Sequence, residues 1–148
     1  MSDNPFVGKW SYRSFLNDPN LAIPPDGKDP NIQPLLLGFG TLDIAEAAPE
    51  LLVGTIGGGG WSLDLHGSRS YGSPAQVRFQ GKGIVRGAEW IYDYIGWLVP
   101  VWPSSDQSLQ VPAIVGSVTR TIPHPTGKDD KAIAPAGVVA SFYAVRQS

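Results

Sequence analysis

One carboxylate within an otherwise apolar segment is the residue whose setting points most directly to chemistry. Asp93 lies in segment 89–100 (EWIYDYIGWLVP), which predicts a central β-strand. Alternate residues of a strand point to opposite faces, so Asp93 shares its face with apolar side chains: Ile91, Ile95, Trp97 and Val99. A buried carboxylate needs donors or becomes neutral. Asp93 is therefore a candidate general acid, general base or ligand anchor. The alternative is a structural hydrogen bond to a tyrosine hydroxyl or to an arginine: Arg78, Arg86 or Arg120.

A second candidate is a carboxylate and an imidazole two residues apart. In segment 61–67 (WSLDLHG), Asp64 and His66 share the polar face of a predicted strand, opposite Trp61, Leu63 and Leu65. An imidazole held by a carboxylate can act as a general base. Asp93, Asp64 and His66 are thus the predicted catalytic residues. The alternative for Asp64 and His66 is that they lie on a polar strand face that is turned to solvent.

Aromatic side chains supply most of the predicted ligand contacts. The predicted ligand-binding residues are Trp10, Tyr12, Trp61, Tyr92, Tyr94, Trp97 and Arg120. Tyr92 and Tyr94 lie on the face opposite Asp93, so only one of these two faces can line a cavity if the strand is regular. The alternative for each aromatic residue is a place in the core or in a subunit contact.

The sequence lacks the residues or motifs that several kinds of functional site require. The chain has no cysteine, and its two histidines, His66 and His124, have no metal-ligand spacing, so we expect no metal site. We expect His124, within Pro-His-Pro, to be a surface turn residue. The glycine run 57–60 lacks the Lys-Ser/Thr of a phosphate loop, and no Gly-x-Ser-x-Gly motif occurs, so we expect neither a cofactor nor a serine nucleophile.

The net charge and the hydropathy of the sequence argue against two kinds of partner, nucleic acid and membrane. The net charge is −2 without a Lys/Arg cluster, which argues against nucleic acid. No apolar run approaches the ~20 residues of a membrane helix, and the first ten residues do not resemble a signal peptide. We therefore expect no membrane partner and a cytoplasmic location.

The elements that must position these residues are predicted to be strands. Eighteen glycines and fourteen prolines spread over 148 residues suit short strands and tight turns, so we expect one all-β domain over residues 1–148. Gly57–Gly60 and Arg86-Gly87 predict hairpin turns. Segment 45–50 could form one helical turn, and 17–34 and 123–137 predict loops. The predicted strands are 7–16, 35–44, 51–56, 61–67, 75–85, 89–100, 110–122 and 138–146.

About eight sequential strands without crossover helices favour an antiparallel up-and-down barrel, which leaves no exposed edge. Both faces of segment 89–100 are largely apolar, so we expect a second layer or another subunit to cover the outer face. A homo-oligomer, either a dimer or a tetramer, is the prediction.

Gly8-Lys9-Trp10, in the first strand of this barrel, resembles the Gly-x-Trp start of the calycins, the lipocalins and avidin-like proteins. Arg146 in the last strand resembles the basic residue that lipocalins pack on that tryptophan. Nothing after Arg146 can form the lipocalin C-terminal helix, so the avidin-like form fits better. The resemblance implies a small molecule bound in the barrel mouth, with loop 17–34 as a lid.

Three hypotheses follow. The leading one is a barrel that binds a small apolar or aromatic molecule. The second is a cofactor-free barrel enzyme, an isomerase, cyclase or lyase, in which a lumenal carboxylate acts as acid or base. The third is a structural or assembly domain.

Overall fold

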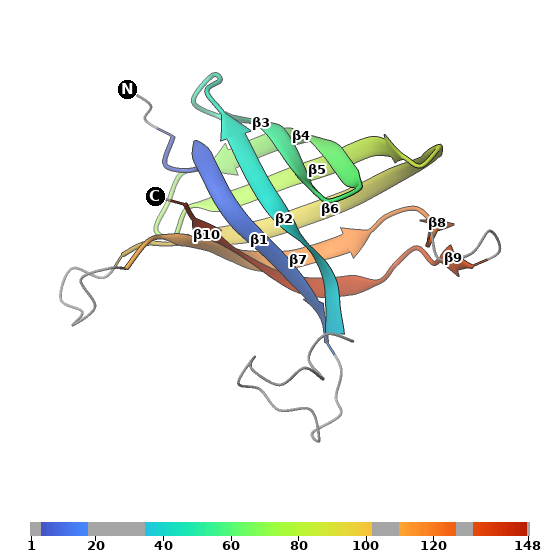
Figure 1. Ribbon diagram of the computed structural model, residues 1–148. Coiled ribbons are helices and arrows are strands. Elements are labelled where there is room, and N and C mark those ends of the chain that lie inside the picture. Colours follow the sequence, from blue (N-terminus) through green and yellow to red (C-terminus); the bar gives the residue numbers. More distant parts are fainter. Residues whose placement is uncertain (1–3, 18–34, 102–109, 127–131, 148) are drawn as a thin grey trace.

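The eight long strands of the chain form a closed antiparallel barrel (Figure 1). The structure, a computed structural model, describes residues 4–17, 35–101, 110–126 and 132–147. The barrel strands are β1 (Gly8–Leu16), β2 (Leu36–Ala45), β3 (Leu51–Gly58), β4 (Trp61–Ser70), β5 (Gln76–Val85), β6 (Ala88–Val99), β7 (Ala113–Arg120) and β10 (Val139–Arg146). Each strand pairs with the next barrel strand in the chain, and β10 pairs with β1. The predicted all-β, up-and-down barrel is confirmed.

Closure of the barrel joins the two ends of the chain. The β1–β10 register places Trp10 directly opposite Arg146, and the guanidinium carbon of Arg146 lies 5.2 Å from the centroid of the Trp10 ring. A cation–π contact of this kind contributes about 1 kcal/mol. The predicted contact between the first and last strands is therefore present.

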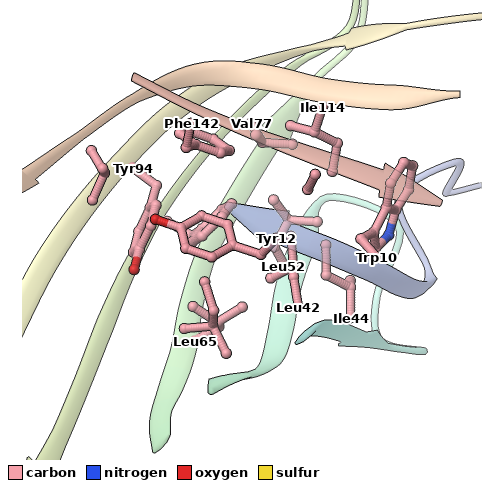
Figure 2. Packing of buried hydrophobic residues seen from close by; sticks show 14 of the residues in the cluster. Trp10, Tyr12, Leu42, Ile44, Leu52, Leu65, Val77, Tyr94, Ile114 and Phe142 are labelled. Carbon is pink, nitrogen blue, oxygen red and sulfur yellow. The ribbon is translucent and has the colours of Figure 1, made fainter. Parts of the chain in front are cut away.

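The segment before β1 closes one end of the barrel, which we call the closed end. Phe6 is fully buried there, and its carbonyl accepts a hydrogen bond from Trp10 Nε1 at 2.9 Å. Arg146 donates to the carbonyls of Pro5 and Val7 at 3.1 and 2.8 Å. Figure 2 shows Trp10 beside Ile44, at a distance from the Tyr12 and Tyr94 pair. These contacts leave the closed end filled with side chains.

Strand β6 turns its tyrosine face inward. Tyr92 and Tyr94 are buried, whereas Asp93 and Trp97 are exposed. Tyr92 pairs with Gly81 of β5, where an added Cβ would lie 3.3 Å from Tyr94 Cε1. The glycine therefore leaves room for the Tyr94 ring, and the burial of both tyrosines settles which face of β6 lines the barrel.

Local structure differs from the sequence prediction at four places, of which the first is β7, Ala113–Arg120, shorter than the predicted strand 110–122. Segment 46–50 is not helical; it ends in a turn in which Leu51 N donates to Ala48 O at 2.9 Å. Proline at position 49 suits the second place of such a turn. Strand β4 continues to Ser70 because Ser70 pairs with Gln76. The predicted loop 123–137 contains a two-stranded sheet, β8 (His124–Pro125) with β9 (Ile133–Ala134).

Both predicted hairpin turns are confirmed. Gly58 pairs with Trp61 around a two-residue turn in which Gly60 has φ 83°. Val85 pairs with Ala88 around a second two-residue turn. Arg86 and Gly87 have φ 48° and 79°, and a type I′ hairpin turn requires positive φ at both of its central residues. The predicted lid, 17–34, lies outside the described residues except for Asn17.

The outer surface carries an apolar row across β6, β7 and β10. Trp97 and Tyr143 both pair with Val115, and the three side chains are 37 to 40% exposed. The homo-oligomer that would cover this row stays a prediction. No helix in the described part of the chain is long and apolar enough to cross a membrane.

Candidate functional site

A cavity occupies the end of the barrel opposite Phe6 and Trp10, which we call the open end. Its volume is about 120 Å³, and the strands β1, β2, β4, β6 and β7 supply its walls. All its lining side chains are uncharged, and five of them are aromatic. The lining residues are Tyr12, Ser14, Leu37, Gly38, Trp61, Leu63, Trp90, Tyr92, Tyr94 and Val118.

Tyr12 and Tyr94 line the deep part of the cavity, toward the barrel core. Their rings meet edge to face with centroids 6.1 Å apart, and Figure 2 shows them side by side among apolar side chains. Phe79 stacks on Tyr94 at 4.7 Å, and Phe142 contacts both tyrosines. Tyr12 and Tyr94 thus form an aromatic wall against which Phe79 and Phe142 pack.

The hydroxyl groups of this wall stay protonated. The Tyr12 hydroxyl is hydrogen-bonded to those of Ser14 and Tyr94. Burial raises the pKa of Tyr12 to about 12, and burial together with the nearby Tyr12 raises the pKa of Tyr94 well above its ordinary value of 10. The deep part of the cavity therefore offers a ligand hydroxyl groups but no charge at neutral pH.

A polar cluster of Tyr92, Arg120 and His124 lies at the open end; we call it the rim cluster. The Tyr92 hydroxyl lies 2.8 Å from His124 Nε2, and Arg120 Nε donates to the same hydroxyl oxygen at 2.9 Å. Arg120 Nη1 also donates to the carbonyl of Pro135 at 3.2 Å. These bonds join β6 and β7 of the barrel to β8 and to the chain after β9.

Trp90 supports the rim cluster from the side. The His124 ring stacks on the Trp90 ring with centroids 4.0 Å apart and an angle of 15° between the planes. The Arg86 guanidinium lies 5.5 Å from the Trp90 ring and donates to Gly60 O. Trp90 Nε1 is buried and has no hydrogen-bond partner among the described residues. The indole is therefore close to both an imidazole and a cation.

His124 is held in one tautomer. Its Nδ1 lies 2.8 Å from the carbonyl of Pro125, which can only accept, so Nδ1 carries the hydrogen and the neutral Nε2 accepts from Tyr92. Burial lowers the pKa of His124, and the charges of Arg120 and Arg86 lower it further, against an opposing effect of the Pro125 hydrogen bond. His124 is thus neutral at pH 7.

The predicted catalytic residues lie on the outer surface. Asp93 is exposed and accepts a hydrogen bond from Gln80 at 3.2 Å, instead of the arginine or tyrosine partner expected for it. Asp64 and His66 are exposed on β4. The reason is the two-residue period of the strands, which turns Tyr92, Tyr94, Leu63 and Leu65 inward. An acid–base role inside the cavity does not fit these three side chains.

Four of the predicted ligand-binding residues do line the cavity: Tyr12, Trp61, Tyr92 and Tyr94. Trp10 is fully buried at the closed end, and Trp97 is 40% exposed on the outer surface. Arg120 is buried beside the cavity, where it holds the Tyr92 hydroxyl without being a wall residue.

Sequence reasoning missed Trp90 and His124 as site residues. The expectation that His124 lies in a surface turn is wrong, since the residue is only 5% exposed. Trp90 lies on the same inward face of β6 as Tyr92, so the two-residue period of the strand could have predicted that Trp90 is a site residue. His124 is buried by the return of β8 toward β6, which local sequence does not reveal.

The described residues include no group of three His, Asp or Glu side chains placed to hold a metal ion. Comparison with protein-family models, curated proteins and solved structures found no match to this chain.

Proposed function

We propose that this protein binds a small, uncharged, apolar or aromatic molecule in the cavity at the open end of the barrel. The observation that carries the proposal is an aromatic-walled cavity at one end of a barrel whose other end is filled by Phe6 and Trp10. Sites of this kind in barrels combine apolar walls with a few polar groups that orient the ligand. Here those polar groups are the hydroxyls of Ser14, Tyr12 and Tyr94.

Charge and size limit the ligand. The wall has no charged side chain, and Arg86 and Arg120 lie close to the open end, so a cationic ligand is disfavoured. No carboxylate of the described residues forms an ion pair with either arginine. The cavity of about 120 Å³ is comparable to an engineered apolar cavity of roughly 150 Å³ that admits benzene. One aromatic ring system, or its aliphatic equivalent, suits this space.

Binding is tested by isothermal titration calorimetry with indole, an uncharged compound with one aromatic ring system. We expect saturable binding by the wild-type protein. Trp61→Ala removes a wall residue and should weaken binding about tenfold, the loss of one aromatic contact with its buried area.

Trp97→Ala is the matched control, because it removes the same side chain from the outer surface. Its affinity should equal that of the wild type. Absence of saturable binding by the wild type, or equal losses in the two variants, would overturn the proposal.

A further inference from the structure

The Tyr92 hydroxyl is equipped to exchange a proton. It has a proton acceptor on one side, His124 Nε2 at 2.8 Å, and a permanent donor on the other, Arg120 Nε at 2.9 Å. Because Pro125 O fixes the hydrogen of His124 on Nδ1, the Tyr92 hydrogen points to Nε2. A phenol in this setting can pass its hydrogen to the imidazole while the guanidinium stabilises the oxygen left behind.

This hydroxyl belongs to a residue of the cavity wall, whereas the predicted acids and bases face solvent. The charged and titratable groups around His124 are Tyr92 from β6, Arg120 from β7 and Arg86 from the turn between β5 and β6. No carboxylate of the described residues is hydrogen-bonded to the rim cluster. The field at Tyr92 is therefore positive, which favours a developing negative charge on its oxygen or on a molecule beside it.

We infer that the cavity is an active site in which Tyr92 transfers protons to and from carbon, without a cofactor, on an uncharged substrate that has a C–H bond next to a carbonyl or an equivalent acceptor. The inference rests on the proposed function, since it uses the same cavity.

The proton transfers balance without an oxidant or a reductant. Tyr92 Oη takes the proton of the substrate C–H bond, the Tyr92 hydrogen moves to His124 Nε2, and the electron pair of the C–H bond passes into the carbonyl to give an enolate. The imidazolium then returns its proton to Tyr92, and Tyr92 protonates a different carbon. The net reaction is an isomerisation.

The surroundings of His124 suit this cycle. Its lowered pKa keeps Nε2 free to accept at neutral pH and makes the imidazolium, once formed, a stronger acid that gives its proton back. Stacking on Trp90 fixes the imidazole plane, so that Nε2 stays directed at the Tyr92 oxygen. Tyr92 is thus the catalytic residue, and Arg120 and Trp90 are positioning residues.

The test uses 5-nitrobenzisoxazole, a small uncharged aromatic compound. Removal of its ring C–H proton by a base breaks the N–O bond and gives a coloured cyanophenolate. We expect the wild type to accelerate this reaction. Tyr92→Phe should lower the rate at least about tenfold, as expected for loss of a general base. Asp93→Asn, the neighbouring residue on the outer face, is the matched control and should keep the full rate.

His124→Gln provides a second variant that keeps the hydrogen bond to Tyr92, although it loses the stacking on Trp90. The glutamine carbonyl can accept the Tyr92 hydrogen bond but cannot take up the proton, so the rate should fall at least about tenfold in a variant that urea unfolding shows to be folded. In the wild type, the rate should hold as the pH falls to the ordinary histidine value of about 6.5 and drop only at lower pH. His124→Gln should lack this drop.

Affinity for indole, measured on the same variants, separates the two proposals. If the probe binds but Tyr92→Phe or His124→Gln keeps the wild-type rate, or if the wild type gives no acceleration, the inference is overturned and the binding function stands. If the probe does not bind to the wild type, both fail.

Discussion

Gly38 offers a way to fill the cavity without disturbing the barrel. It pairs directly with Ser14, whose side chain faces inward, so a side chain at position 38 would enter the cavity. Its φ is not positive, and an added Cβ would meet only Ser14 Oγ, at 3.5 Å, which is an ordinary contact. Gly38→Leu should therefore fold normally.

The expected loss of affinity follows from the size of the new side chain. Leucine adds four carbon atoms to a cavity of about 120 Å³. If these displace four apolar ligand atoms at about 0.8 kcal/mol each, binding weakens by roughly 3 kcal/mol, or about a hundredfold.

Calorimetric titration with indole measures this loss, and urea unfolding shows whether the variant is folded. Gly59→Leu is the matched control, because an added Cβ at this hairpin position has no heavy atom within 4 Å and its φ is not positive. It should bind like the wild type. A folded Gly38→Leu variant with wild-type affinity would refute the placement of the ligand.

Two further predictions concern stability. Because the pKa of His124 is lower in the folded state, the unfolded chain binds more protons as the pH falls below about 6.5, so the free energy of unfolding should decrease there. This contribution is present above pH 6.5, and urea titrations should show a smaller decrease for His124→Gln; equal pH slopes would contradict the burial of the imidazole. Arg146→Met keeps the side-chain stem but removes the cation on Trp10 and two hydrogen bonds, so it should lower the free energy of unfolding by about 2 kcal/mol. A loss below about 0.5 kcal/mol in urea unfolding would show that this contact does not help to close the barrel.

The strands and their hairpins could be predicted because they follow from local patterns. Two-residue alternation marked the strands, and glycine or Arg-Gly dipeptides marked the hairpins. Trp10 and Arg146 supplied the one long-range indication, and they are paired across β1 and β10. The strands and hairpins depend on backbone geometry that each segment carries within itself, whereas closure depends on the pairing of β1 with β10.

The site could be predicted only in part, because both faces of β6 are rich in apolar residues. The face of β6 that turns inward depends on the partner strand, where Gly81 leaves space for the Tyr94 ring. That pairing is a tertiary property. Without it, sequence reasoning selected Asp93 as a site residue, although its neighbours Tyr92 and Tyr94 are the residues that face the cavity. The burial of His124 depends likewise on the β8–β9 return over Trp90.

A crystal structure of the protein grown with indole tests the central claim most directly. We predict electron density for the probe between Trp61, Tyr12 and Tyr94, at the open end of the barrel. Density only on the outer face near Trp97, or an open end filled by protein side chains, would contradict it.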